Sequence, residues 1–260
     1  MLKVVTWNVN SINVRLERVL AFLERWKPDI LMLQELKCPE EKFPFEAIRQ
    51  AGYESAVLGQ KTYNGVAIIS KGPLEDIQVG MDPFYEDVAA RVIRGKMGGI
   101  TFLCCYVPNG QEVGSEKFQY KLNWFQGLQK LVESYQVNEQ PLILGGDFNI
   151  APDDRDVHDP KSWEGKILCS KVERDNFSNL LALGLSDVFR IHHDEGGIFS
   201  WWDYRAFGFQ RNHGLRIDFV LASDFLAKLC THTIIDREER KGERPSDHAP
   251  MIAEFNLPIK

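Results

Sequence analysis

The sequence predicts an α/β protein in which two β-sheets pack against each other and helices cover the outside. Strand–helix–strand units occur in both halves of the chain, and their strands end in similar polar residues. A length of 260 residues, with 44% hydrophobic and 26% charged residues, provides ample material for a sizeable core. No low-complexity segment, charge block or linker divides the chain, so we expect one domain spanning residues 1–260.

The N-terminal half begins with two strands separated by a helix. Residues 2–9 alternate in polarity and are rich in Val, Thr and Trp, which predicts a strand. Residues 11–26 carry apolar side chains at helical spacing and precede a proline, and the apolar run 30–33 predicts the next strand. A short helix and two hairpins complete this half: the helix at 45–50, strands 53–58 and 65–70, and strands 88–93 and 100–107 across the glycine-rich turn 95–99.

The stretch PLILGGDFNIAP, residues 141–152, combines a buried strand with a polar end. Its apolar run 142–144 predicts the strand, and the two following glycines predict a sharp turn. Asp147 and Asn149 then project from the strand's end, while the apolar residues between and after them point into the core. An Asx turn closed by Pro152 is the alternative interpretation. The neighbouring elements are expected to be helices 118–135 and 172–183, the latter ended by Gly184, and strands 198–204, 215–222 and 251–256.

Charge and cysteine content narrow the functional classes. A net charge of −6 argues against indiscriminate polyanion binding, although a local basic groove is compatible with it. The five cysteines include the adjacent pair Cys104-Cys105 and show no zinc spacing, so we expect reduced thiols in a cytoplasmic protein. Neither an export signal nor a membrane span is visible.

Polar residues gather at six expected strand ends. Taken singly, each has a structural explanation; Asp218, for example, could pair with Arg216. Taken jointly, they would bring like charges together, which repel unless a cation or a proton intervenes. Carboxylates and amide oxygens without thiolates indicate a site for Mg²⁺ or Mn²⁺. The residues concerned are Asn8, Asn10, Glu35, Tyr106, Asn109, Asp147, Asn149, Asp218, Asp247 and His248.

His248 adds a group that can change protonation near neutral pH. An acidic residue such as Asp218 could hold its ring in one orientation. A metal, an oriented water, a base and an acid together suit attack on a phosphoryl group. The alternative for residues 246–248 is a proline-bounded turn with a capping aspartate, which is disfavoured because Asp and His stand directly before a core strand.

Seven motifs in order resemble the exonuclease III family of apurinic/apyrimidinic (AP) endonucleases: WNVN, LQELK, YVPNG, GGDFNIAP, FSWWDYR, GLRIDFVLAS and PSDHAP. Each motif is weak alone, whereas seven in order over nearly the whole chain are highly specific. The family belongs to a wider group of metal-dependent endonucleases, exonucleases and phosphatases. The resemblance implies a four-layered α/β sandwich, with two packed mixed β-sheets flanked by helices.

The resemblance also implies a metal centre that binds Mg²⁺ or Mn²⁺. Glu35 is expected to be the principal ligand. Asn8, Asn10 and Asp247 are expected on the same cluster, binding the ion directly or through water.

The resemblance assigns catalytic roles to five residues. Asp147 would activate the attacking water, and Asn149 would orient that water and stabilise the transition state. Tyr106 would touch the phosphate or assist the leaving oxygen. His248, oriented by Asp218, would hydrogen-bond the scissile phosphate; either it or Asp147 serves as the base.

The substrate is expected to be double-stranded DNA with abasic sites or blocked 3′ ends. Trp201, Leu215 and Ile217 match the family's apolar pocket for an extruded abasic sugar, a small unpaired group that is cheap to flip out. Asn109 and Arg205 are further substrate-binding candidates. Basic residues in or beside loops could grip phosphates on both sides of the lesion: Lys37, Lys61, Arg91, Arg94, Lys171, Arg205 and Arg211.

The expected activity is hydrolysis of the phosphodiester 5′ to an abasic site, in base excision repair. The same site is expected to act as 3′–5′ exonuclease and as 3′-phosphatase or phosphodiesterase. The protein is expected to be a monomer. One alternative is a 3′-end-processing exonuclease with little AP endonuclease activity, since the segment 153–170 matches the family least. A second keeps the metal but hydrolyses a phosphoinositide or sphingomyelin headgroup. A third is a nucleic-acid-binding regulator that has lost catalysis; it is disfavoured because Glu35, Asp147, Asn149, Asp218 and His248 are all present.

Overall fold

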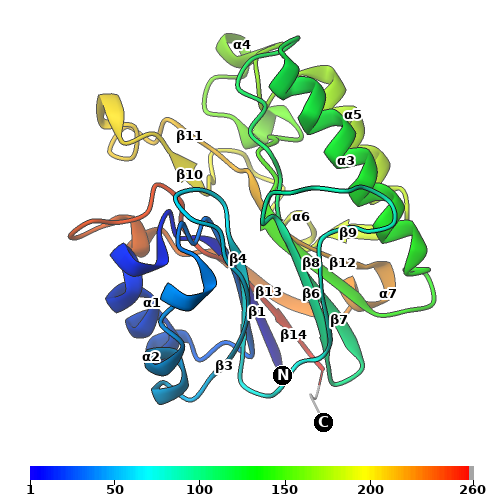
Figure 1. The fold of residues 1–260 in the computed structure, drawn as a ribbon. Helices are drawn as coiled ribbons and strands as arrows, with labels where there is room; N and C mark the ends of the chain where they lie inside the picture. The colour runs from blue at the N-terminus through cyan, green and yellow to red at the C-terminus, as the bar shows by residue number, and fades with distance from the viewer. Residues whose placement is uncertain (258–260) are drawn as a thin grey trace.

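Two six-stranded β-sheets face each other at the centre of the molecule (Figure 1). The structure is a computed structural model that describes residues 1–257. The first sheet has the strand order β13 (Cys230–Ile235), β14 (Met251–Phe255), β1 (Leu2–Asn8), β2 (Ile30–Gln34), β4 (Val66–Ser70) and β3 (Glu54–Leu58). The second has the order β5 (Glu75–Val79), β6 (Val92–Met97), β7 (Ile100–Tyr106), β8 (Leu142–Asp147), β12 (Asp218–Ser223) and β9 (Leu185–Asp187). A small ladder pairs β10 (Trp201–Trp202) with β11 (Gly214–Leu215).

Helices cover the outer face of each sheet and complete four layers (Figure 1). The first sheet is covered by α1 (Ile12–Trp26) and α2 (Phe45–Gln50), and the second by α3 (Glu116–Ser134) and α5 (Lys171–Leu181). This arrangement confirms the expected α/β sandwich. Shorter helices are α4 (Pro160–Trp163), α6 (Val188–His192) and α7 (Asp224–Ala227), and 3₁₀ turns occur at Glu40–Lys42, Asp154–Asp156, Arg205–Phe207 and Arg237–Arg240. Within residues 1–257, no helix has the length and apolar character needed to cross a membrane.

The long helices begin and end where local chemistry dictates. At the start of α3, the Ser115 hydroxyl accepts a hydrogen bond from the Phe118 amide. Ser170 and Glu173 form a reciprocal capping box at the start of α5. At the end of α1, Lys27 adopts a left-handed backbone with φ 48° and donates to the Leu23 carbonyl, and a proline follows.

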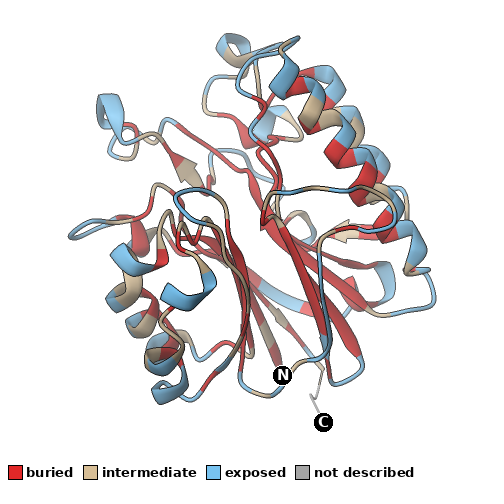
Figure 2. Ribbon diagram, in the orientation of Figure 1, coloured by how far each residue is buried: buried red, intermediate tan, exposed pale blue. Residues whose placement is uncertain are grey.

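Three apolar clusters hold the layers together. Between the sheets, Met32 of the first sheet packs with Phe102 and Val220 of the second. Under α1, Trp7 packs with Phe22, and a third cluster lies beneath α3 and α5. Figure 2 shows the central strands of both sheets as buried and the outward faces of the helices as exposed. Packed side chains therefore support each sheet on both of its faces.

The strand register brings the expected polar ends to one edge of both sheets. The parallel pair β1–β2 aligns Asn8 with Gln34, and the parallel pair β7–β8 aligns Tyr106 with Asp147. Strand β12 runs antiparallel to β8, so that its first residue, Asp218, lies opposite Asp147. Each sheet therefore presents polar side chains at the end where ligands bind in α/β proteins.

The turn expected at Gly145-Gly146 is wrong, because β8 continues through both glycines to Asp147. Their role is close packing. A Cβ on Gly145 would lie 2.2 Å from the Cε of Met32 on the facing sheet, and one on Gly146 would lie 2.1 Å from the Cys105 carbonyl oxygen.

Other strand boundaries also differ from expectation. Strand β6 starts at Val92 rather than at Val88, which is fully exposed, and it extends to Met97 through part of the expected turn. The expected strand 215–222 is interrupted between β11 and β12, because the Arg216 amide donates to the Asp156 carbonyl outside the sheet. The expected strand 198–204 is reduced to the two residues of β10. Strands β5, β9 and β13 were not expected.

Candidate active site

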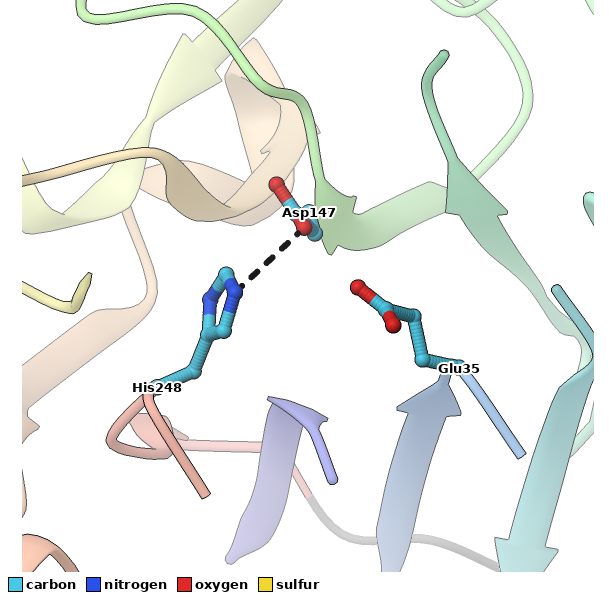
Figure 3. Close-up of side chains that lie close together, drawn as sticks. All are labelled: Glu35, Asp147 and His248. Atoms are coloured by element: carbon cyan, nitrogen blue, oxygen red, sulfur yellow. Dashed lines mark ion pairs between the residues drawn. The ribbon is translucent and has the colours of Figure 1, made fainter. Parts of the chain in front are cut away.

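Glu35, Asp147 and His248 converge at the shared edge of the two sheets (Figure 3). Each offers a possible ligand atom, and these atoms all lie within 4.8 Å of one another. Glu35 directly follows β2, Asp147 ends β8 and His248 precedes β14, so the cluster draws on both sheets. Packed strands on both sides fix the separation of the three groups.

Asparagine amides connect the carboxylates of this cluster. The Asn8 side-chain amide donates to Glu35 Oε1 at 2.8 Å and to Asp147 Oδ2 at 2.9 Å. The Asn10 amide donates to Asp247 Oδ1 at 2.9 Å. Asn10, Glu35 and Asn149 all have left-handed backbones, with φ values of 45°, 54° and 49°. Such conformations are uncommon outside glycine and concentrate at functional sites.

Positive charge balances the Glu35 side of the site. The Lys37 ammonium lies 2.8 Å from Glu35 Oε2 and donates to Asn10 Oδ1 at 2.6 Å. Burial by itself raises the pKa of Glu35, but Lys37 and the Asn8 amide outweigh it and place the pKa below its usual value. Burial likewise raises the pKa of Asp247, but the charge of His248 and the hydrogen bond from the Asn10 amide outweigh it and place the pKa below its usual value. Both carboxylates are therefore ionised at neutral pH.

His248 is held in one orientation by a buried carboxylate. Its Nδ1 lies 2.9 Å from Asp218 Oδ2, and its Nε2 lies 3.7 Å from Asp147 Oδ2. The alternative pairing of Asp218 with Arg216 does not occur, because Arg216 pairs with Asp156 and Asp187. Burial would lower the pKa of His248, but the charges of Asp218 and Asp147 raise it to about 10. The ring is therefore a cation at neutral pH.

Asp147 differs from the other carboxylates of the site. Its burial raises its pKa to about 7, although the charge of His248 and the hydrogen bond from the Asn8 amide act in the opposite direction. A carboxylate with this pKa can accept and release a proton near neutral pH.

Tyr106 and two asparagines line the same edge. The Tyr106 hydroxyl donates to Glu35 Oε1 at 3.0 Å, and burial together with the charge of Glu35 raises its pKa well above the usual value. The hydroxyl therefore remains a proton donor. The Asn109 amide donates to Asn149 Oδ1 at 3.0 Å, and the Asn149 amide donates to the Val107 carbonyl at 3.0 Å. The two asparagines thus form one connected pair beside Asp147.

Comparison with known proteins identifies the class of this chain. The model of the endonuclease/exonuclease/phosphatase family matches residues 5–248. The chain belongs to this family. The resemblance to this family that the sequence motifs indicated is thus confirmed. Individual proteins of the family are also similar to this chain over its whole length.

One similar family member is exodeoxyribonuclease III of Haemophilus influenzae, with 35% identity over 266 residues, covering 98% of this chain and 100% of that protein. A Neisseria 3′ phosphatase, NExo, solved bound to a product DNA hairpin, has 46% identity and a TM-score of 0.96, covering 99% of this chain and 100% of that one. An AP endonuclease from Archaeoglobus fulgidus has 38% identity and a TM-score of 0.95, with the same coverage.

The three residues expected to line the family's sugar pocket lie together. Leu215 and Ile217 are buried in an apolar cluster with Ala151, Val157, Leu168 and Cys169, and Trp201 packs against it. The Trp201 indole N–H also donates to Asp247 Oδ2 at 3.0 Å, which links this cluster to the acidic one. The adjacent Trp202 is fully buried and packs in the core between the sheets instead.

The basic residues expected to contact DNA divide into two groups. Four of them are exposed: Lys61, Lys171, Arg205 and Arg211. Arg205 pairs with its neighbour Asp203 at 2.7 Å and keeps its side chain 87% exposed. Arg94 is buried in β6, where it donates to the Gly80 carbonyl and to Gln78, so it does not face a ligand. Arg91 stacks over the Tyr106 ring at 4.8 Å.

Ser200 is a site residue that sequence reasoning overlooked. Its hydroxyl donates to Asp218 Oδ2 at 2.6 Å and accepts from the Ile217 and Asp218 amides. It therefore fixes the carboxylate that orients His248. The residue lies within the FSWWDYR motif, so the signal was present, but its partner is a distant strand that only the fold brings near.

Proposed function

We propose that this chain is a metal-dependent DNA-repair nuclease that hydrolyses the phosphodiester 5′ to abasic sites and also acts on 3′ ends, where it serves as 3′–5′ exonuclease and 3′-phosphatase or phosphodiesterase. The observation that carries the proposal is the convergence of Glu35, Asp147 and the His248–Asp218 pair at one edge, in a chain of this family. Relatives named as exodeoxyribonuclease III, a DNA-bound 3′ phosphatase and an AP endonuclease support it.

The carboxylate and amide oxygens of the site fit a hard divalent cation. Glu35 and Asp247 are ionised, and Asn8 and Asn10 place amide groups beside them. We assign the ion to Glu35 as principal ligand, with Asn8, Asn10 and Asp247 binding directly or through water. Mg²⁺ or Mn²⁺ bound there would neutralise negative charge on the phosphate under attack.

Different side chains of the site then carry out the proton transfer and stabilise the charge that develops on the phosphate. Asp147, with its pKa near neutrality, takes a proton from the attacking water. The amide of Asn149 orients that water, and Asn109 keeps Asn149 in place. The His248 cation hydrogen-bonds a phosphate oxygen, while Asp218 holds its ring. The Tyr106 hydroxyl contacts the phosphate or donates toward the leaving oxygen.

DNA contact completes the proposal. We assign the extruded sugar to Trp201, Leu215 and Ile217, and flanking phosphates to Asn109 and Arg205. We further propose a monomer, because one chain supplies every residue of the site. A cytoplasmic location is proposed because all five cysteines are free and buried, which suits a reducing compartment.

A 3′-end-processing exonuclease with little AP endonuclease activity is the second candidate, and the conformation of Leu168 favours it. Leu168 is 5% exposed, packs in the cluster of Leu215 and Ile217, and has a left-handed φ of 71°. A leucine held there at conformational cost would narrow the pocket that we assign to the abasic sugar. NExo, also solved as a 3′–5′ exonuclease, is 46% identical to this chain.

One assay tests both candidates. A duplex with a single abasic-site analogue is compared with an undamaged duplex carrying a recessed 3′ end, in Mg²⁺ and in EDTA. Metal-dependent incision 5′ to the lesion supports the first candidate, and trimming without incision supports the second. Failure to cleave either duplex refutes both.

A further inference from the structure

Lys121 is a buried cation that reaches the active-site edge from helix α3. It lies on α3, its side chain is 1% exposed, and its ammonium group makes three hydrogen bonds. Two go to backbone carbonyls of the site, to Asn109 at 3.1 Å and to Asn149 at 2.6 Å. The third goes to the Glu173 carboxylate on α5. The full donor capacity of the ammonium is therefore used by three separate segments.

Glu173 extends this connection to the loop before α5. Its Oε1 also accepts from the Leu168 amide at 3.1 Å, and its Oε2 accepts from the amide and the hydroxyl of Ser170 at 3.1 and 2.6 Å. The carboxylate thus holds the loop that carries Leu168 against the apolar cluster. One ion pair joins the asparagine pair to that loop.

We propose that Lys121 and Glu173 are positioning residues that fix the Asn109–Asn149 amide pair for the transition state and set the loop conformation at Leu168. The inference rests on the proposed function of the same site. Stability alone does not account for the pair, because well-packed apolar residues usually stabilise a core as well as a buried ion pair does. Five of the six bonds made by the two charges end on residues 109, 149, 168 or 170, and the sixth joins them to each other.

The hydrogen bond from the Lys121 ammonium to the Asn149 carbonyl matters because Asn149 has a left-handed backbone with φ 49°. The Lys121 ammonium holds this backbone carbonyl in place and so fixes the backbone from which the Asn149 side chain projects; that side chain accepts from the Asn109 amide and donates to the Val107 carbonyl. Displacements of about 1 Å in such groups cost up to about a hundredfold in rate. Lys121 would thus influence catalysis without touching the substrate.

The test compares Lys121→Met with Leu128→Ala, a buried substitution on the same face of the same helix but about two turns further along it, in the apolar cluster beneath α3. Both are assayed below their melting temperatures, with the wild type alongside, on the abasic and recessed duplexes. We expect Lys121→Met to lower kcat by about tenfold to a hundredfold with KM changed by less than about threefold. Leu128→Ala should retain the wild-type kcat.

A double-mutant cycle separates positioning from a general structural role. Single-turnover rates are measured for Lys121→Met in the wild type and in an Asn149→Ala background. A positioning role predicts that Lys121→Met costs little once the Asn149 amide is gone. Equal fold-losses in both backgrounds, or a Lys121→Met variant that behaves like Leu128→Ala, would overturn the inference while leaving the proposed function intact.

Glu173→Gln keeps the test decisive if Lys121→Met does not fold, because it alters the carboxylate while preserving its size. It should lower kcat by at least about threefold, and an unchanged kcat overturns the inference. An inactive wild type would instead refute the proposed function, and the inference with it.

Discussion

His248 Nδ1 and Asp218 Oδ2 lie 2.9 Å apart with both side chains buried, and this pair makes the stability of the protein depend on pH. The pKa of His248 is raised from 6.5 to about 10, so its stabilising contribution is complete below pH 6.5 and is lost as the pH rises through 10. We expect the free energy of unfolding of the metal-free protein to fall by a few kcal/mol between pH 7 and pH 10. Urea unfolding at several pH values measures this.

Asp218→Asn is the matched control for that titration. It keeps the shape of the side chain and removes the larger of the two main charges, those of Asp218 and Asp147, that raise the pKa of His248. The variant should be less stable than the wild type at pH 7 and should show a shallower decline toward pH 10. An equally steep decline in both proteins would assign the titration to another group.

Asp147→Asn should abolish cleavage while leaving DNA binding largely intact. General-base catalysis contributes about a hundredfold to ten-thousandfold to the rate, so kcat should fall by at least about a hundredfold. The melting temperature should stay the same or rise, because the raised pKa of Asp147 shows that its burial disfavours the charge. Rates, binding isotherms and thermal melts together test this, and surviving cleavage would remove Asp147 from its assigned role.

Trp201→Ala should impair incision at abasic sites more than trimming of 3′ ends, because the indole packs on the apolar cluster assigned to the sugar. The substitution also removes the hydrogen bond to Asp247, and Trp201→Phe serves as control because it loses the N–H but keeps an apolar ring. The kcat/KM values of the three proteins on the two duplexes measure the difference. Equal losses on both substrates would remove the pocket assignment.

Leu168→Gly distinguishes the two candidate functions. Glycine adopts a φ of 71° without strain and vacates the space beside Leu215 and Ile217. If Leu168 restricts the pocket, the ratio of abasic incision to 3′ trimming should rise by about tenfold, the scale of one apolar group in a specificity pocket. Leu168→Ala should give a smaller rise, since it keeps a Cβ. An unchanged ratio in both variants would show that Leu168 does not restrict access.

Gly145→Ala should destabilise the protein through the contact between the sheets. The new methyl group would lie 2.2 Å from Cε at the end of the flexible but buried Met32 side chain, so we expect a cost near the lower end of the about 1 to 3 kcal/mol typical of overpacking. The loss should shrink in a Met32→Ala background, where the clash is absent. Chemical unfolding of the four proteins gives the coupling energy, and strictly additive losses would contradict the close-packing role of Gly145.

The sequence was most informative about groups whose position depends on a strand end. Asp147 and Asp218 could be predicted to share an edge because each directly borders an apolar run, and the sheet register places them opposite each other. The role of Gly145 could not be predicted, because it is decided by Met32 on the other sheet. Strand β5 escaped prediction because all its residues are exposed, and β9 because it has only three residues.

Lys121 shows a different limit of sequence reasoning. It occupies the apolar stripe of α3, in line with Phe118 and Phe125, and a lysine there is a visible anomaly. Its partners are a carboxylate 52 residues away and two loop carbonyls, and nothing in the sequence links them to Lys121. Buried ion pairs of this kind become interpretable only when the helices are placed on the sheet.

The division of the site between the two halves of the chain has a consequence for assembly. Separation of the chain in the segment 136–140 would leave Asn8, Glu35 and Tyr106 on one fragment and Asp147, Asp218 and His248 on the other. Neither fragment would carry a working set of groups, and DNA hydrolysis would return only when the two fragments associate through the strand pairs β1–β14 and β7–β8 and through the inter-sheet core. The enzyme could therefore serve as a split reporter, in which DNA hydrolysis records the docking of one half onto the other.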